Sequence, residues 1–203
     1  MSEMIENPED YFRQFVPERR QVFTLIEEEA AREDIPIVGP VVGELLYILV
    51  RALKARRVLE LGTATGYSAL QMGFALDVDG RLTSLESDPA LADRARERIR
   101  HAGLEERVAV VTGDAVAIIS NMKENFDFIF LDIEKADYLK VLPQCRRVLR
   151  PGGIMVADNT GFADADRFNR GIYIDPGWKV VNLFSFLPGH SPENDGLCIA
   201  LRR

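Results

Sequence analysis

Acidic and amide side chains directly follow two apolar segments of this 203-residue chain. Asp132 follows the segment 126–131, and Asp158 and Asn159 follow the segment 154–157. If these segments are neighbouring parallel strands, their carboxyl ends meet at one edge of the sheet and bring three oxygen donors together. Two carboxylates and an amide oxygen suit Mg²⁺, whereas Zn²⁺ prefers sets that contain His or Cys. The pattern predicts a magnesium site, although a helix cap at Asp132 and a turn at Asp158 and Asn159 are the alternative.

Lys135 lies three residues after Asp132, about one helical turn away, and can face the same pocket. A lysine beside a metal-bound hydroxyl group can remove its proton, so Lys135 is the candidate general base. The alternative is a solvated lysine that pairs with Glu134 or Asp137, both of which we interpret as surface charges.

A glycine-containing turn follows the apolar segment 58–61. Gly62 and Gly66 allow a tight bend and a close approach to a ligand. The spacing differs from the dinucleotide fingerprint G-x-G-x-x-G. Glu60 would repel a pyrophosphate, but it suits the cationic amino-acid end of S-adenosylmethionine.

A second acidic residue, Glu86, ends the next apolar segment, about 20 residues after Gly66. An acid at this place can accept hydrogen bonds from both ribose hydroxyls. Each feature alone fits an ordinary turn or helix start, but together they predict a bound nucleoside cofactor. Gly113, Asp114 and Ala115, after the third segment, are the expected place for adenine contacts.

The elements that must position these residues form an α/β pattern from residue 55 onward. Short apolar segments alternate with helical ones, which predicts a doubly wound, Rossmann-like parallel sheet. The five parallel strands are expected at 58–61, 82–85, 108–111, 126–131 and 154–157. Two more strands, 179–186 and 197–201, are joined without a helix and predict an antiparallel pair, giving a seven-stranded, mostly parallel sheet.

The clearest helices of this half are 87–101, with Ser87 as N-cap and Gly103 as its end, and 135–149, closed by Pro151 and two glycines. Residues 1–54 are expected to form additional helices, beginning near Pro8 and covering 17–32 and 40–54. We therefore expect a single domain, 1–203, with N-terminal helices in 1–54 and a Rossmann-like core in 55–203.

Composition restricts the class of protein further. The chain is 47% apolar and 28% charged, which excludes wholesale disorder. A net charge of −7 makes nucleic acid an unlikely partner, although Arg51, Lys54, Arg56 and Arg57 form a local basic patch. Cys145 and Cys198 suggest neither a zinc knuckle nor a disulfide framework. The acidic start and the lack of an apolar run of about 20 residues predict a cytoplasmic protein without a membrane span.

Several stretches together resemble one known family. They are Val38–Leu46, Val58–Leu70, Phe126–Lys135, Pro151–Gly153, Asp158–Asn159 and Asp195–Leu197. The sequence resembles the cation-dependent O-methyltransferases, class I S-adenosylmethionine-dependent enzymes that include catechol and caffeoyl-CoA O-methyltransferases.

The resemblance implies roles for individual residues. The cofactor site would be lined by Val38, Glu60, Gly62, Ser68, Glu86, Ala115 and Asp132. Asp132, Asp158 and Asn159 would bind the divalent cation, with Mg²⁺ as the expected ion, and Lys135 would be the catalytic base. Members are commonly homodimers, with the N-terminal helices at the interface or over the active site.

The sequence departs from the family pattern after Asn159 and before Asp195. The usual continuation after Asn159 is missing, and Glu193 is only near the position of an expected acceptor-binding carboxylate. We interpret His190 as an exposed loop histidine and Trp178 as a packing residue.

The predicted function is methyl transfer from S-adenosylmethionine to a hydroxyl group of a metal-chelated, catechol-like or vicinal-diol small molecule. Three alternatives remain open. They are a tRNA hydroxyuridine O-methyltransferase, a nicotinamide-dependent reductase, and a cofactor-binding protein without turnover.

Overall fold

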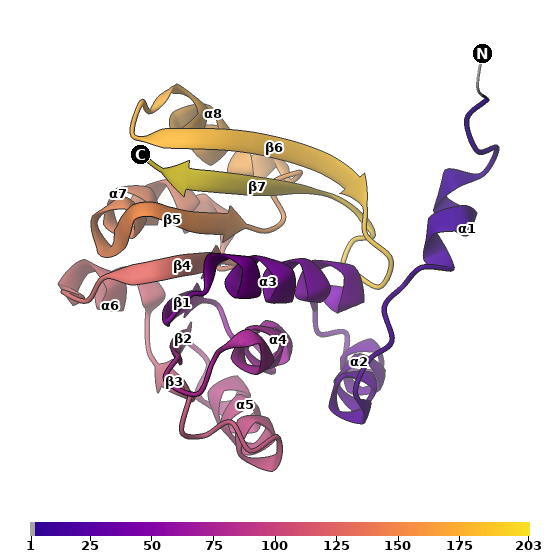
Figure 1. The fold of residues 1–203 in the computed structure, drawn as a ribbon, viewed down its shortest axis with the longest axis horizontal. Helices are drawn as coiled ribbons and strands as arrows, with labels where there is room; N and C mark the ends of the chain where they lie inside the picture. The colour runs from indigo at the N-terminus through magenta and orange to yellow at the C-terminus, as the bar shows by residue number, and fades with distance from the viewer. Residues whose placement is uncertain (1–2) are drawn as a thin grey trace.

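The computed structural model describes residues 3–203, which form a seven-stranded mixed sheet in the order β3-β2-β1-β4-β5-β7-β6 (Figure 1). The strands are β1 (Arg57–Leu61), β2 (Arg81–Glu86), β3 (Val108–Thr112), β4 (Phe126–Leu131), β5 (Leu149–Ala157), β6 (Trp178–Phe186) and β7 (Asn194–Arg202). Strands β1 to β5 are parallel, and β7 pairs antiparallel with both β5 and β6. The predicted doubly wound sheet with an antiparallel C-terminal pair is confirmed.

Alternating side chains along the central strands supply two hydrophobic cores, one on each face of the sheet. Val58 and Phe128 are fully buried on one face, and Leu59 and Ile129 are fully buried on the other. Because both faces of a parallel sheet are covered, the strands are apolar on both sides, as their sequences indicate.

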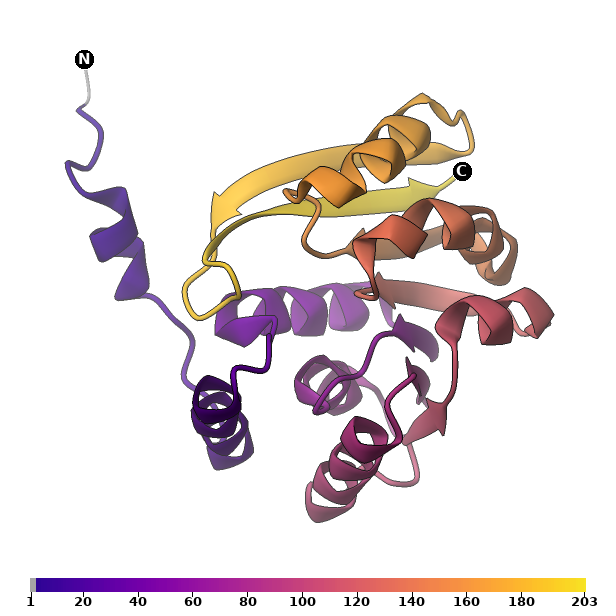
Figure 2. The same cartoon turned by 180° about the vertical axis from the view of Figure 1, so that it is seen from behind.

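The helices divide between these two faces. On the first face lie α2 (Gln21–Glu33), α3 (Gly39–Leu53), α4 (Tyr67–Ala75) and α5 (Pro89–His101). On the second lie α6 (Ala115–Asn121), α7 (Tyr138–Val148) and α8 (Asp166–Ile174), seen in front of the sheet in Figure 2. Short 3₁₀ turns, Lys135–Asp137 and Ala163–Ala165, precede α7 and α8.

Several predicted helix boundaries are wrong. The helix expected to begin at Pro17 begins only at Gln21, because the backbone of Arg20 is still extended. Asp88 caps α5, because its Oδ1 accepts from the backbone N–H groups of Ala90 at 2.7 Å and Leu91 at 3.3 Å, so Ser87 is not the N-cap. The helix predicted for 135–149 begins as a 3₁₀ turn and ends at Val148. Residues 149–153 already belong to β5, so the proline and two glycines do not close the helix but continue the strand.

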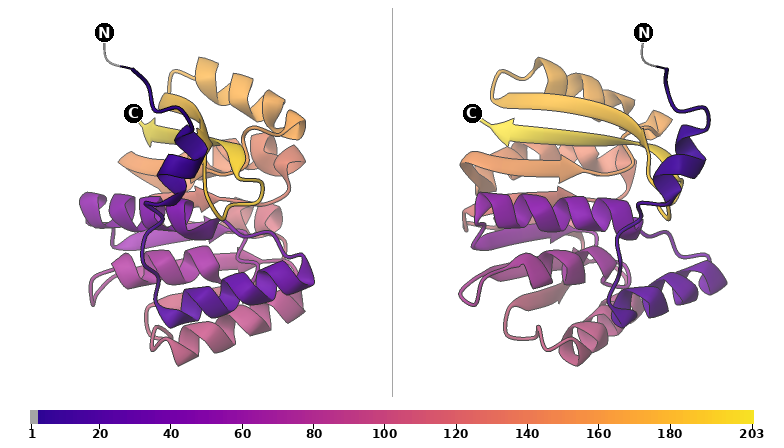
Figure 3. Two further views of the ribbon diagram at one scale, coloured as in Figure 1. Left: turned by 90° about the vertical axis from the view of Figure 1, so that its right-hand side faces the viewer. Right: turned by 45° about the vertical axis from the view of Figure 1, so that its right-hand side comes forward.

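Helix α1 (Pro8–Arg13) buries none of its side chains and lies beside the connection between β6 and β7 (Figure 3). Arg13 attaches α1 to that connection, because its guanidinium group donates two hydrogen bonds, of 2.8 and 2.7 Å, to Glu193. Throughout residues 3–203, no helix combines the length and the apolar character that crossing a bilayer requires.

Candidate functional site

The turn between β1 and α4 is held against the end of β4. Gly62 has a φ of +96°, and a Cβ atom there would lie 1.9 Å from the carbonyl oxygen of Asp132. Gly66 has a φ of +92° at the start of α4. Both positions therefore require glycine, and the close approach at Gly62 brings the turn to the switch point between β1 and β4, where ligands bind in such sheets.

Glu86 joins this turn to the end of β2. Its Oε2 accepts hydrogen bonds from the backbone N–H groups of Thr63 at 3.2 Å and Ala64 at 2.7 Å, and its Oε1 accepts one from Asp88 at 2.9 Å. The carboxylate is therefore fixed in place, with acceptor capacity left for further donors.

Glu60 lies beneath the turn and is fully buried. Ser84 donates a hydrogen bond to its Oε2, whereas its Oε1 has no partner among the described residues. Burial raises the pKa of Glu60 to about 8, and the nearby charges of Asp132 and Glu86 act in the same direction. A buried carboxyl oxygen without a partner is costly, so this position fits a hydrogen-bond donor of a bound ligand.

Two adjoining cavities lie above this turn. The smaller, about 90 Å³, is lined in part by Val38, Gly62, Ser68, Glu86 and Asp132. The larger, about 340 Å³, shares Gly62, Glu86 and Asp132 and adds Ala115 and Lys135. The structure therefore brings all the predicted cofactor residues together, with Glu60 below the cavities rather than in their walls.

Asp132 and Lys135 face each other at the end of β4. Lys135 Nζ lies 3.3 Å from Asp132 Oδ1, and the two side chains are 24% and 26% exposed. Burial and the neighbouring Asp158 carboxylate raise the pKa of Asp132 to about 6, against the opposing charge of Lys135. The pair places a lysine amino group, which donates to the carboxylate of Asp132, at the rim of the larger cavity.

Asp158 and Asn159 are buried at the end of β5, and each is bonded to a residue from the C-terminal hairpin. Both Asp158 carboxylate oxygens lie near His190 Nε2, at 2.9 and 3.0 Å. Asn159 Nδ2 donates to Asp195 Oδ2 at 2.7 Å, so the carbonyl oxygen of the amide is turned away from Asp195.

His190 is not an exposed loop histidine, as the sequence suggested; its side chain is 1% exposed. Burial alone would lower the pKa of His190, but its hydrogen bond with Asp158 and the charge of that residue outweigh burial and raise it. The prediction failed because a contact across 32 positions leaves no local signal in the sequence. Trp178 is 3% exposed and packs in the core, as predicted.

Within residues 3–203, no group of three or more His, Cys, Asp or Glu side chains is arranged around a common metal position. The predicted ligand set has a different composition, two carboxylates and one amide, and its hard oxygen donors come from the ends of adjacent strands. Because Asp195 orients the Asn159 amide, its oxygen is left available as a ligand. The donor set fits a divalent cation, and the metal site stays a prediction.

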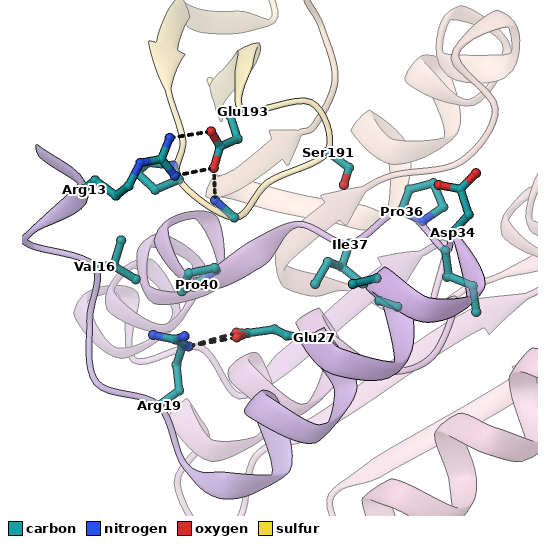
Figure 4. A pocket seen from close by; sticks show the side chains of 15 residues that line it. Arg13, Val16, Arg19, Glu27, Asp34, Pro36, Ile37, Pro40, Ser191 and Glu193 are labelled. Atoms are coloured by element: carbon teal, nitrogen blue, oxygen red, sulfur yellow. Dashed lines mark hydrogen bonds and ion pairs between the residues drawn. The ribbon is translucent and has the colours of Figure 1, made fainter. Parts of the chain in front are cut away.

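A third cavity, about 470 Å³, opens between α2, the segment before α3 and the β6–β7 connection (Figure 4). Its walls are mainly apolar, and they include Val16, Ile37 and Pro40. It shares Pro36 and Ile37 with the small cavity above the glycine turn. An apolar molecule in this cavity would therefore border the cofactor site.

The sequence profile of a family described as O-methyltransferase matches residues 19–170. The chain belongs to this family.

Individual relatives agree with this assignment. The catechol O-methyltransferase of Niastella koreensis is 40% identical over 126 residues, which cover 60% of this chain and 57% of that protein. This chain thus spans little more than half the length of that relative. The Bacillus cereus O-methyltransferase in complex with S-adenosylhomocysteine (SAH) superposes with a TM-score of 0.85, at 28% identity and 97% coverage of both chains. The O-methyltransferase TomG of Streptomyces achromogenes in complex with S-adenosylmethionine (SAM) superposes with a TM-score of 0.86. It is 25% identical, and the match covers 98% of this chain and 99% of TomG.

Proposed function

We propose that this O-methyltransferase transfers the methyl group of SAM to a hydroxyl group of a small, catechol-like or vicinal-diol acceptor. The observation that carries the proposal is the continuity between the cavity at the glycine turn and the Asp132–Lys135 pair at the end of β4. The relatives named catechol O-methyltransferase and the SAH- and SAM-bound neighbours support it.

The cofactor would occupy the two cavities above the turn. Glu86 would accept hydrogen bonds from the ribose hydroxyls, Ala115 would lie against the adenine, and the amino-acid end would lie near Ser68 and Glu60. This placement would supply the missing partner of Glu60 Oε1.

A divalent cation, with Mg²⁺ as our first choice, would be held by Asp132, Asp158 and Asn159. When bound, it would make an acceptor hydroxyl more acidic and orient the acceptor oxygens. Lys135 would take the hydroxyl proton at Nζ, which stands beside Asp132 at the cavity rim. The oxygen would then attack the sulfonium methyl group directly, without a covalent enzyme intermediate.

The third cavity indicates what kind of acceptor fits. Arg13 is paired with Glu193 and Arg19 with Glu27, so both cationic side chains at this cavity are already neutralised (Figure 4). An apolar lining with paired charges favours a neutral aromatic body over a phosphorylated one. No contact of the described residues favours the tRNA alternative.

We also propose a cytoplasmic homodimer, in keeping with the family resemblance. Light scattering coupled to size-exclusion chromatography tests the oligomeric state directly.

The proposed function predicts methylation of simple catechols that depends on SAM and is abolished by EDTA. A panel of catechol, caffeate, caffeoyl-CoA, a flavonoid and tRNA, each with and without Mg²⁺, is read by mass spectrometry as the gain of one methyl group. Methylation of tRNA alone, or full activity in excess chelator, would contradict the proposed acceptor or the proposed metal, respectively.

Glu60 predicts a proton linked to cofactor binding. With its pKa raised to about 8, the carboxyl group is mostly protonated at pH 7 in the empty protein. A bound ammonium group favours the ionised form, so SAH binding should release up to one proton at pH 7, and affinity should rise as pH increases from 6 to 8. Calorimetry in two buffers with different ionisation enthalpies measures this release. The Glu60→Gln variant should show none, and equal release from both proteins would contradict the assignment.

A further inference from the structure

The hydrogen bonds of His190 hold its ring at both nitrogens. Nδ1 lies 2.6 Å from the carbonyl oxygen of Pro192, and Nε2 lies 2.9 and 3.0 Å from the two oxygens of Asp158. The ring is therefore fixed between the Pro192 carbonyl group and the Asp158 carboxyl group.

This ring occupies the carboxylate oxygens that Asp158 would offer to a cation. Nε2 is almost equidistant from the two carboxylate oxygens, so it occupies the position between them. Both side chains are only 1% exposed, so this contact is buried and the hydrogen bonds are stronger than they would be in water.

Each carboxylate at these strand ends already has a nitrogen partner. Lys135 Nζ lies 3.3 Å from Asp132 Oδ1, and His190 Nε2 lies 2.9 Å from Asp158 Oδ2. A divalent cation that takes the oxygens of Asp158 would have to replace the hydrogen bonds of His190, so it would bind well only after the ring had moved away.

We propose that His190 competes with the divalent cation for Asp158, so that metal binding requires His190 to leave this carboxylate. The proposal rests on the proposed function for the location of the metal site, but it concerns a residue that the ligand set does not include. His190 thereby sets the metal affinity of this chain.

The same movement would reach the third cavity, which we assign to the acceptor and call the acceptor cavity. His190 belongs to the connection 187–193 between β6 and β7, and its neighbours Gly189 and Ser191 line the cavity (Figure 4). Gly189 packs against α3 so closely that a Cβ atom at Gly39 would lie 2.3 Å from its carbonyl oxygen. Displacing His190 would therefore shift one wall of the acceptor cavity, which couples metal loading to acceptor binding.

Binding of Mn²⁺ to the full-length protein, measured by electron paramagnetic resonance without SAM or acceptor, tests the competition. We expect His190→Ala to bind Mn²⁺ at least about tenfold more tightly than the unchanged protein, with His190→Gln in between because its amide can still donate a hydrogen bond to Asp158. The only other histidine, His101, is exposed, and His101→Ala is the matched control that should leave the affinity unchanged. Adding Asp158→Asn to His190→Ala should remove the gained affinity.

An unchanged or weaker affinity in both His190 variants would overturn the proposal, because His190 would then be neutral toward the ion or support it. Tight binding that survives Asp158→Asn, or no Mn²⁺ binding to any variant, would overturn it as well. SAH affinity, measured on each variant, reports whether the fold and cofactor site are intact. Failure of the proposed methyl transfer would appear in the acceptor panel and leave the Mn²⁺ result readable by itself.

Discussion

Replacing Lys135 by alanine is expected to lower kcat by about 10²–10⁴-fold, the usual contribution of a positioned general base. Lys135 Nζ is 3.3 Å from Asp132 and stands at the rim of the cavity that adjoins the glycine turn. The variant loses the group that takes the hydroxyl proton but keeps the residues that line the turn. SAH affinity should therefore remain nearly unchanged, and calorimetry together with steady-state kinetics separates the two effects.

Lys140 provides a matched control for this variant. It pairs with Asp137 at 2.5 Å, the same three-residue spacing as Lys135 and Asp132, but its side chain is 66% exposed and lies outside the cavities. Lys140→Ala should leave kcat unchanged. If kcat falls equally in both variants, the effect comes from the loss of a local positive charge and not from the loss of a base. If kcat is unchanged in Lys135→Ala, Lys135 is not the general base.

The sheet was predictable because its signals are local. Short apolar segments separated by helical ones predict parallel strands, and the segments 58–61 and 126–131 lie within one residue of β1 and β4 at both ends. Local signals also explain the wrong N-cap of α5 and the wrong end of the helix before β5, because in both places the local sequence fits two structures. Ser87 and Asp88 are both good caps, and a proline followed by two glycines ends a helix as readily as it interrupts a strand.

The site was predictable where residues lie at strand ends, and not where a distant loop reaches them. Asp132 and Asp158 follow adjacent strands, so topology alone brings them to one edge of the sheet. His190 arrives from a connection between antiparallel strands, where no periodic pattern fixes the path of the backbone. Its burial depends on the contact with Asp158 itself, which only the folded chain shows.

Replacing Gly62 by alanine is expected to lower both stability and cofactor binding. A residue with a side chain at a φ of +96° is strained, and the added Cβ would lie 1.9 Å from the Asp132 carbonyl oxygen, so the turn must move away from β4. Strain and overpacking together should reduce the free energy of unfolding by about 3 kcal/mol or more. Because the displaced turn lines the cofactor cavity, kcat/KM should fall by about 10²-fold.

Gly103→Ala separates these two causes. Gly103 also has a positive φ, +68°, but a Cβ atom there would meet no other atom within 4 Å, and the residue lies after α5, away from the cavities. In the control, backbone strain alone should lower the free energy of unfolding, by about 1 kcal/mol, and the SAH affinity should stay unchanged. Urea denaturation and SAH titration of both variants make the comparison. If Gly62→Ala behaves like Gly103→Ala, the turn tolerates a side chain, and the contact between the glycine turn and the end of β4 does not shape the site.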